Sequence, residues 1–227
     1  MDDIFSRSEA LLGTQAMDAL RTKKVIIFGV GGVGSLAAEA LIRTGLTHLT
    51  IVDDDLVQAS NINRQLPATT LTVGRPKVEV LRERLLTINP EAEIIARCER
   101  VNEEWLEVNG LEEYAYVIDA IDSVAEKTDL ILRASRVRGC KVFSSMGAAL
   151  RFDPTPVRVA DLFDVKGDAL AKAVRARMKR LDKYPNKKIR CVYSLEQAQR
   201  CETRGSLMQV TAVFGCTLVS LIIRDLL

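Results

Sequence analysis

A glycine-rich turn directly follows the first apolar run of the chain. Residues 26–28 lead into Gly29, Gly31, Gly32 and Gly34, which form a Gly-x-Gly-Gly-x-Gly pattern. An apolar β-type run that enters such a turn is typical of a nucleotide phosphate bound at the N-terminus of a helix, because glycine lets the backbone approach the phosphate closely. The turn predicts a nucleotide site, but it does not distinguish a nicotinamide enzyme from an enzyme that uses ATP.

Acidic and basic residues follow the next apolar run. Asp53 lies about 20 residues after the glycine turn, where a carboxylate can accept hydrogen bonds from two ribose hydroxyls. Arg64 and Lys77 come soon afterwards, and their positive charges suit a triphosphate from which pyrophosphate leaves. Asp55 either belongs to the same pocket or caps the following turn. This combination favours an adenylating enzyme over a nicotinamide-dependent oxidoreductase, in which Arg64 and Lys77 would have no task.

Alternating apolar runs position these residues at the ends of strands. We expect strands at residues 24–29, 48–53, 92–98, 116–120, 141–145 and 157–160, and helices at 8–20, 35–44, 77–88, from after Ser123 to Arg138, and within 166–190. This alternation predicts a doubly wound α/β sheet, in which ligands bind at the carboxyl ends of the strands. The 227 residues suit one domain. We divide it into an N-terminal helix and arm (1–23), a nucleotide-binding core (24–150) and an extension for substrate binding and dimerisation (151–227).

The last apolar stretch spans residues 210–223 and contains Gly215. Because a membrane-spanning helix needs about 20 apolar residues, the stretch is too short to cross a bilayer. We expect a buried or dimer-facing helix that is interrupted at Gly215.

The composition is that of a globular protein, and it argues against a disulfide framework and a structural zinc site. Hydrophobic residues make up 48% and charged residues 27% of the chain. The five cysteines are odd in number and include no Cys-x-x-Cys pair. The chain begins with Met1, Asp2 and Asp3 and shows no charged-then-apolar leader, so we expect a cytoplasmic protein.

Positive charge is concentrated in residues 166–190. This segment holds ten basic and two acidic residues, a net charge of +8 in a chain whose total is +2. Apolar residues recur in it at helical spacing, which predicts that the following residues form its inner face: Leu170, Val174, Met178 and Leu181. The basic residues then gather on the outer face as candidates for phosphate contacts: Lys172, Arg175, Lys179 and Lys183. The alternative is a merely solvated helix face.

Taken together, these motifs resemble the superfamily of ubiquitin-activating-type and sulfur-carrier adenylating enzymes, the E1/ThiF type. The matching elements are Gly29–Gly34, Asp53-x-Asp55, Ser60-Asn61-x-x-Arg64-Gln65, Val73-Gly74-x-x-Lys77, Ile88-Asn89-Pro90 and Asp119-x-x-Asp122. The resemblance implies a Rossmann-like sheet with a C-terminal extension.

The same resemblance implies a role for each matching residue. It assigns the ribose hydroxyls to Asp53, the phosphates to Arg64 and Lys77, the shape of the ATP pocket to Asn61 and Gln65, and Mg²⁺ to Asp122. It also implies that Arg7 reaches into the ATP site of a partner chain, and therefore that the protein is a homodimer. Asp119 is expected to cap the end of its strand rather than to bind a ligand.

A second set of motifs resembles one branch of this superfamily, the tRNA threonylcarbamoyladenosine dehydratases. It comprises residues 119–123, 151–155, the basic segment, 191–196 and 210–215. The resemblance implies ATP-dependent activation of the threonylcarbamoyl carboxylate on a tRNA adenosine, followed by ring closure to an oxazolone. It implies tRNA as substrate and admits a sulfur-relay protein as partner. The alternative is adenylation of a sulfur-carrier protein, but the two zinc-binding Cys-x-x-Cys pairs common in that branch are absent.

Two further residues have open roles. Cys191 lies beside basic residues that would lower the pKa of its thiol, yet ring closure needs no thiol, so it is either functional or structural. His48 precedes a strand and is expected at the surface.

Overall fold

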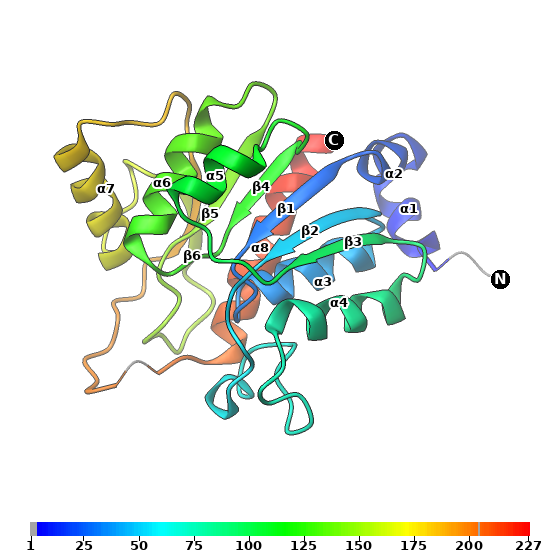
Figure 1. Ribbon diagram of the computed structural model, residues 1–227, viewed down its shortest axis with the longest axis horizontal. Helices are drawn as coiled ribbons and strands as arrows, with labels where there is room; N and C mark the ends of the chain where they lie inside the picture. The colour runs from blue at the N-terminus through cyan, green and yellow to red at the C-terminus, as the bar shows by residue number, and fades with distance from the viewer. Residues whose placement is uncertain (1–3, 204) are drawn as a thin grey trace.

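The chain folds into a seven-stranded sheet covered by helices on both faces (Figure 1). The computed structural model describes residues 4–203 and 205–227. Its strands are β1 (Lys24–Phe28), β2 (His48–Val52), β3 (Glu93–Arg97), β4 (Tyr116–Asp119), β5 (Lys141–Ser145), β6 (Val157–Asp161) and β7 (Arg190–Ser194). Their order is β3-β2-β1-β4-β5-β7-β6, and each neighbouring pair is parallel except β6 and β7. The predicted doubly wound sheet is confirmed, with its switch point between β1 and β4.

Helices cover the sheet in two layers. They are α1 (Ser6–Leu12), α2 (Thr14–Arg21), α3 (Gly34–Thr44), α4 (Lys77–Ile88), α5 (Glu103–Asn109), α6 (Val124–Arg136), α7 (Ala169–Leu181) and α8 (Met208–Leu226), with the 3₁₀ turn η1 (Ala59–Asn61). Successive side chains of β1 point to opposite faces of the sheet and therefore pack against different helix layers. Val25 and Ile27 pack with α3, α4 and α8, whereas Ile26 and Phe28 pack with α5, α6 and α7.

The N-terminal helix expected at residues 8–20 is two helices. Gly13 separates α1 from α2 with a φ of +79°, a left-handed conformation that glycine adopts without strain. The ring of Phe5 lies 3.6 Å from the position that a Cβ on Gly45 would occupy, just before β2. Helix α1 therefore lies at the amino ends of the strands (Figure 1).

Helix α8 is continuous through Gly215, contrary to our expectation. A Cβ on Gly215 would lie 2.6 Å from the carbonyl oxygen of Val33, so glycine allows α8 to cross α3 closely. The length argument was also wrong, because this 19-residue helix is long and apolar enough to cross a membrane. Its packing indicates a core helix instead, since Phe214, Leu218 and Ile222 are fully buried against α3 and the sheet.

The basic helix is α7, and most of its predicted inner face is confirmed. Val174 and Met178 are fully buried, together with Ala171. Leu181 is 37% exposed instead of buried. It is the last residue of α7, which ends where Asp182 turns the chain with a φ of +51°.

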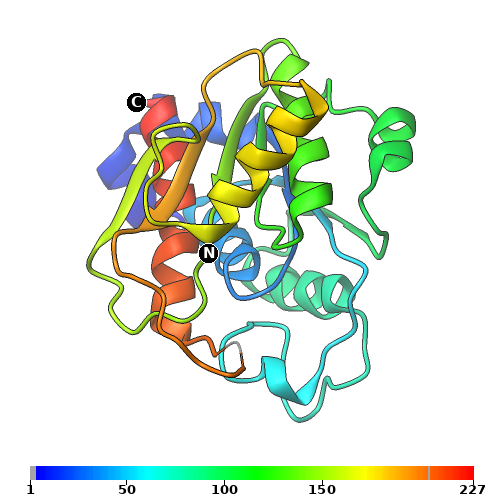
Figure 2. The same cartoon turned by 90° about the vertical axis from the view of Figure 1, so that its left-hand side faces the viewer.

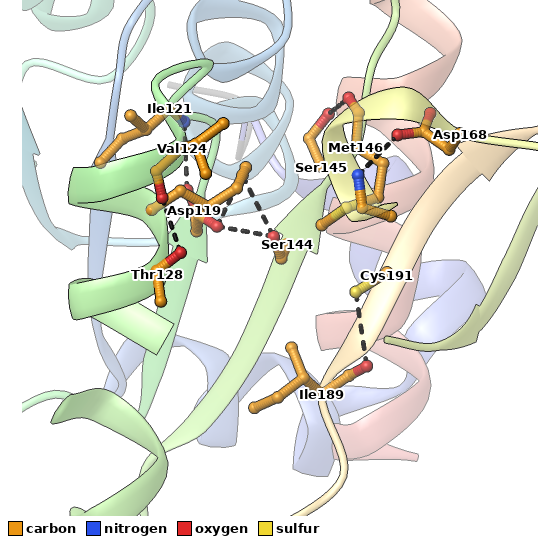
Figure 3. Close-up of polar contacts among 12 residues, drawn as sticks. Asp119, Ile121, Val124, Thr128, Ser144, Ser145, Met146, Asp168, Ile189 and Cys191 are labelled. Atoms are coloured by element: carbon orange, nitrogen blue, oxygen red, sulfur yellow. Dashed lines mark hydrogen bonds and ion pairs between the residues drawn. The ribbon is translucent and has the colours of Figure 1, made fainter. Parts of the chain in front are cut away.

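A buried ion pair joins β4, β5 and α6 (Figure 3). Lys127 and Asp119 are fully buried, and the Lys127 ammonium donates to the Asp119 carboxylate at 2.6 Å. The hydroxyl of Ser144 donates to the same carboxylate oxygen, also at 2.6 Å. The other carboxylate oxygen accepts the backbone N–H of Ile121, so Asp119 does cap its strand as predicted. The charge on each partner is tolerated in the core because the other is present.

We predict that Lys127→Met lowers the free energy of unfolding by about 3–5 kcal/mol, because it leaves the Asp119 carboxylate buried without its counter-charge. Adding Asp119→Asn should restore at least half of the loss, since an amide keeps hydrogen bonds to Ile121 and Ser144 without a charge. Urea unfolding of the single and double variants measures both effects. An equal loss in both variants would contradict an electrostatic cause.

Candidate nucleotide-binding site

The glycine turn between β1 and α3 is held tightly against the end of β4. Gly29 has a φ of +84°, and a Cβ there would lie 2.8 Å from the Ala120 carbonyl oxygen. A Cβ on Gly34 would lie 1.8 Å from the Gly29 carbonyl oxygen, which no side chain can tolerate. A Cβ on Gly32 would meet Thr211 of α8 at 3.0 Å. Gly31 differs, because a Cβ there would have no neighbour closer than 3.7 Å. Gly31 is therefore the glycine of this turn whose backbone a ligand could approach.

Asp53 stands at the end of β2 beside this turn. Its carboxylate accepts the backbone N–H of Val30 at 2.7 Å and that of Asp55 at 2.9 Å. Burial raises the pKa of Asp53 above its usual range, and the nearby Lys77 ammonium opposes that rise. Each carboxylate oxygen keeps a lone pair beyond these bonds. Asp53 therefore has acceptor capacity left for hydroxyl donors next to the glycine turn.

Lys77 and Asp55, both predicted for the site, contact each other. The Lys77 ammonium lies 2.6 Å from an Asp55 carboxylate oxygen. The Lys77 side chain is only 6% exposed, whereas that of Asp55 is 66% exposed. The backbone N–H of Lys77 also donates to the Asp55 carbonyl at 3.0 Å. Asp55 thus anchors the start of α4 and holds the ammonium beside Asp53.

The loop around η1 carries the other predicted pocket residues. The side-chain oxygen of Asn61 accepts the Gln58 N–H at 3.0 Å and closes the turn. The Arg64 guanidinium donates to the Ser60 carbonyl at 3.0 Å and to the side chain of Asn63 at 2.8 Å. Arg64 is therefore folded back on its own loop.

Gln65 is buried beneath the glycine turn. Its amide nitrogen lies 3.7 Å from the position that a Cβ on Gly31 would take. Its side-chain oxygen is buried and has no hydrogen-bond partner within residues 4–203 and 205–227. Because an unsatisfied buried acceptor is costly, this oxygen indicates a place for a ligand donor or a water molecule.

Asp122 follows β4 on the turn that packs against Gly29. Its side chain is exposed, and within the described chain its carboxylate has neither an ion-pair nor a hydrogen-bond partner. The turn is fixed from below by the bond between Ile121 and Asp119. Asp122 is thus a free carboxylate on a rigid support beside the glycine turn.

Arg7 is not brought to this site within its own chain. It is exposed on α1, and α1 lies at the amino ends of the strands, whereas Asp53 and Asp122 follow the carboxyl ends. The five residues of β2 alone separate these edges by about 16 Å.

Helix α7 is the yellow helix in front of the sheet in Figure 2. Its four candidate phosphate contacts separate into two groups. Lys172, Lys179 and Lys183 are exposed, as expected. Arg175 instead donates to the carbonyls of Leu162 and Val165, at 2.7 and 3.0 Å. Its expected place among the solvent-facing charges is therefore wrong, because the guanidinium ties the preceding loop to the helix.

Cys191 lies in the core, on β7. It is fully buried, and burial raises the pKa of its thiol far above the usual range. The expected lowering by neighbouring basic residues is therefore wrong, and the thiol donates to the Ile189 carbonyl at 3.5 Å. His48 lies at the start of β2, where its ring pairs with exposed Glu93 at 3.0 Å.

Sequence reasoning missed two buried ion pairs that support the site, Lys127–Asp119 and Arg151–Asp168. Asp168 caps α7 through the Ala171 N–H at 2.9 Å and accepts the Gly147 N–H at 3.1 Å, just after β5. The Arg151 guanidinium lies 3.3 Å from the same carboxylate. An acid directly before a helical run is a cap signal that could have identified Asp168, whereas nothing local in the sequence marks Lys127.

Comparisons with known proteins agree with this geometry. The sequence profile of the ThiF family matches residues 5–227. A tRNA threonylcarbamoyladenosine dehydratase of Bacillus subtilis (strain 168) is 42% identical over 179 residues, 78% of this chain and 69% of the relative. The dehydratase of Escherichia coli (strain K12) is 35% identical over 213 residues, 92% of this chain and 79% of the relative.

A solved structure matches the fold as a whole. The crystal structure of E. coli tRNA N6-threonylcarbamoyladenosine dehydratase in complex with ATP superposes with a TM-score of 0.91 at 34% sequence identity, and the match covers 98% of this chain and 93% of that chain. The family profile, the sequence identities and the structural match all agree with the motifs in the sequence, and the chain belongs to the ThiF family.

Proposed function

We propose that this protein is an ATP-dependent enzyme that dehydrates threonylcarbamoyladenosine in tRNA to its cyclic oxazolone form. The observation that carries the proposal is the extent of its similarity to the dehydratases. It runs through 92% of the chain and so includes C-terminal residues beyond the nucleotide-binding core. The ATP complex of a dehydratase with the same fold supports ATP as the co-substrate.

The reaction has two steps whose atoms balance. The threonylcarbamoyl carboxylate attacks the α-phosphorus of ATP. Pyrophosphate is displaced, and an acyl-adenylate forms. The carbamoyl oxygen then attacks the activated carbon, AMP departs with one former carboxylate oxygen, and an N–H proton is released. The net change is loss of one water at the expense of ATP. Ring closure is intramolecular, so the protein mainly has to position the groups and stabilise the leaving AMP.

The geometry of the site supports the proposed nucleotide-binding roles. In this proposal the phosphates lie against the backbone at Gly31, where a Cβ would have no neighbour closer than 3.7 Å, and Asp53 accepts the ribose hydroxyls. Lys77 and Arg64 neutralise the departing pyrophosphate after they exchange their present partners, Asp55 and the η1 loop. The unsatisfied oxygen of Gln65 supports a ligand donor close to Gly31.

Asp122 is the residue that would hold Mg²⁺. Its carboxylate is exposed, lacks a partner in the described chain and is a hard oxygen donor of the kind that Mg²⁺ prefers. When bound, the ion neutralises part of the triphosphate charge. Asp119 cannot share this role, because its carboxylate already accepts hydrogen bonds from Lys127, Ser144 and the backbone N–H of Ile121.

The proposal includes a cytoplasmic homodimer in which Arg7 acts across the interface. Arg7 has an exposed guanidinium at the edge of the sheet opposite to its own glycine turn. A twofold-related partner would present that guanidinium to the site of this chain. The tRNA would lie over α7, where Lys172, Lys179 and Lys183 face solvent.

The proposed function is tested by incubating tRNA that carries threonylcarbamoyladenosine with the protein, ATP and Mg²⁺. Mass spectrometry of the released nucleosides should show the loss of one water, dependent on ATP, and Asp122→Asn should abolish it. Conversion of a Gly-Gly-ended carrier peptide to its adenylate, with no change in the tRNA nucleoside, would contradict the proposal and favour a sulfur-carrier adenylating enzyme.

We predict that Gly31→Ala folds normally but weakens ATP binding roughly 5- to 150-fold, because forcing a methyl group against a bound phosphate costs about 1–3 kcal/mol. The fold should tolerate the methyl group, since its nearest neighbour would be 3.7 Å away. Calorimetric titration with ATP measures the effect. Gly205→Ala is the matched control, because no atom lies within 4 Å of its Cβ position. Unchanged affinity in Gly31→Ala would show that the phosphates bind elsewhere.

The role of Arg7 across the interface predicts complementation. Arg7→Ala and Arg64→Ala should each be inactive alone. After subunit exchange, an equal mixture should regain about a quarter of wild-type activity, because half of the dimers are mixed and one site in each has both arginines. Exchange is verified with differently tagged chains. No recovery in verified mixed dimers would contradict action across the interface.

A further inference from the structure

Two exposed aromatic rings meet beside the end of the basic helix. Phe163 lies on the turn after β6 and Tyr184 on the loop after α7, and they are 48% and 47% exposed. Their ring centroids are 6.3 Å apart, with an angle of 41° between the planes. Leu181, whose periodicity predicted a buried side chain, is exposed three residues before Tyr184. The pair therefore presents ring surface to solvent.

The turn that carries Phe163 is held firmly from both sides. Arg175 donates to the carbonyls of Leu162 and Val165, which flank the ring in sequence. Asp161 accepts the backbone N–H of Phe163 at 3.1 Å and that of Ile189 at 3.1 Å.

The loop that carries Tyr184 is fixed to the neighbouring helix layer. The backbone N–H of Asn186 donates to the Ser135 hydroxyl at 3.2 Å. The Lys187 ammonium donates to the Val137 carbonyl at 2.9 Å and also to the Cys140 carbonyl. Two anchored loops therefore hold the rings in place before any ligand arrives, which lowers the entropic cost of binding.

Positive charge surrounds the two rings in sequence and along α7. The exposed basic residues of this region that make no ion pair in the described chain are Lys166, Lys172, Lys179, Arg180, Lys183, Lys188 and Arg190. The exposed acids among them are Asp164 and Asp182. Cations that follow a backbone, combined with aromatic faces for the bases, are what proteins use to bind unpaired nucleic acid.

The aromatic pair lies well away from the nucleotide edge. Strand β6 runs antiparallel to β7, so that Asp161 pairs with Arg190 at the amino end of the sheet. The start of α7 is fixed by Asp168 to the loop after β5, at the carboxyl end. The 13 residues of α7 span about 20 Å between these ends. A base at the aromatic pair is therefore not the adenosine that reacts.

We propose that Phe163 and Tyr184 form a stacking site for an unpaired base of the tRNA substrate, one helix length from the site of chemistry. This inference rests on the proposed function for the identity of the RNA. The exposed lysines of α7 attract the phosphate backbone, and the two rings fix the position of the RNA along the helix. The pair is thus a second point of attachment that sets how tRNA lies across the protein.

The test compares two classes of variant in tRNA binding measured by fluorescence anisotropy across a NaCl series. Phe163→Ala/Tyr184→Ala should weaken binding roughly 5- to 150-fold, as expected for loss of about 1–3 kcal/mol of stacking, with an unchanged salt slope. Lys172→Gln/Lys179→Gln/Lys183→Gln should instead flatten the slope, because fewer counterions are released. ATP affinity should stay at the wild-type value in both.

Controls separate stacking from other causes. Val108→Ala truncates an apolar side chain that is 78% exposed on α5, away from the basic helix in sequence, and should leave tRNA affinity unchanged. Phe163→Trp/Tyr184→Phe should retain binding, because aromatic faces are kept. Wild-type tRNA affinity in the double alanine variant would overturn the proposal. A change in the oligomeric state of this variant, measured by light scattering, would also overturn it, because the two rings would then belong to a protein interface. Binding is measured without turnover, so a wild-type protein that binds tRNA but does not dehydrate it would contradict only the proposed function.

Discussion

The site depends on the close approach of the glycine turn to the end of β4. Parallel pairing of β1 with β2 and β4 brings Asp53 and Asp122 to one edge of the sheet, and Gly29 and Gly34, which leave no room for a Cβ, allow the turn to pack there against the end of β4. The Lys127–Asp119 pair secures the other side of the contact, because Asp119 binds the backbone N–H of the residue before Asp122. A pair of charges in the core is an expensive way to stabilise a fold. Here it fixes the turn that presents a free carboxylate.

A second pair, Arg151–Asp168, couples the substrate side to the nucleotide side. Asp168 caps α7 and accepts the backbone N–H of Gly147, so the basic helix begins at the carboxyl end of β5. The helix is thereby held to the same sheet edge as the glycine turn. An RNA lying along α7 would pass this edge at its start and the ring of Phe163 at its far end. In the proposed function, this arrangement would orient an extended RNA relative to the nucleotide site.

The sequence predicted the elements that obey local rules and missed those that depend on distant contacts. The strands predicted at 48–53 and 116–120, which correspond to β2 (His48–Val52) and β4 (Tyr116–Asp119), and the inward face at Val174 and Met178 followed from the sequence pattern. The continuity of α8 through Gly215 did not, because glycine there is explained by the crossing of α3. Charge counting found the basic segment but could not separate exposed lysines from Arg175, which is bonded to carbonyls across a loop. The partner of Lys127 likewise depends on tertiary packing.

The predicted phosphate-binding cations have partners within the chain. Lys77 contacts Asp55, and Arg64 contacts the carbonyl of Ser60, so in the proposed site ATP would exchange these partners rather than meet free charges. For Lys77 the exchange is cheap, since Asp55 is 66% exposed and water can solvate its carboxylate after the lysine moves. For Arg64 the exchange would break its bond to the Ser60 carbonyl, while the loop stays closed through the bond from the Gln58 N–H to Asn61. The buried oxygen of Gln65 has no such partner in the described chain. In the proposed site, ligand binding would therefore replace existing contacts at the cations and would supply a hydrogen-bond donor to the Gln65 oxygen beneath the glycine turn.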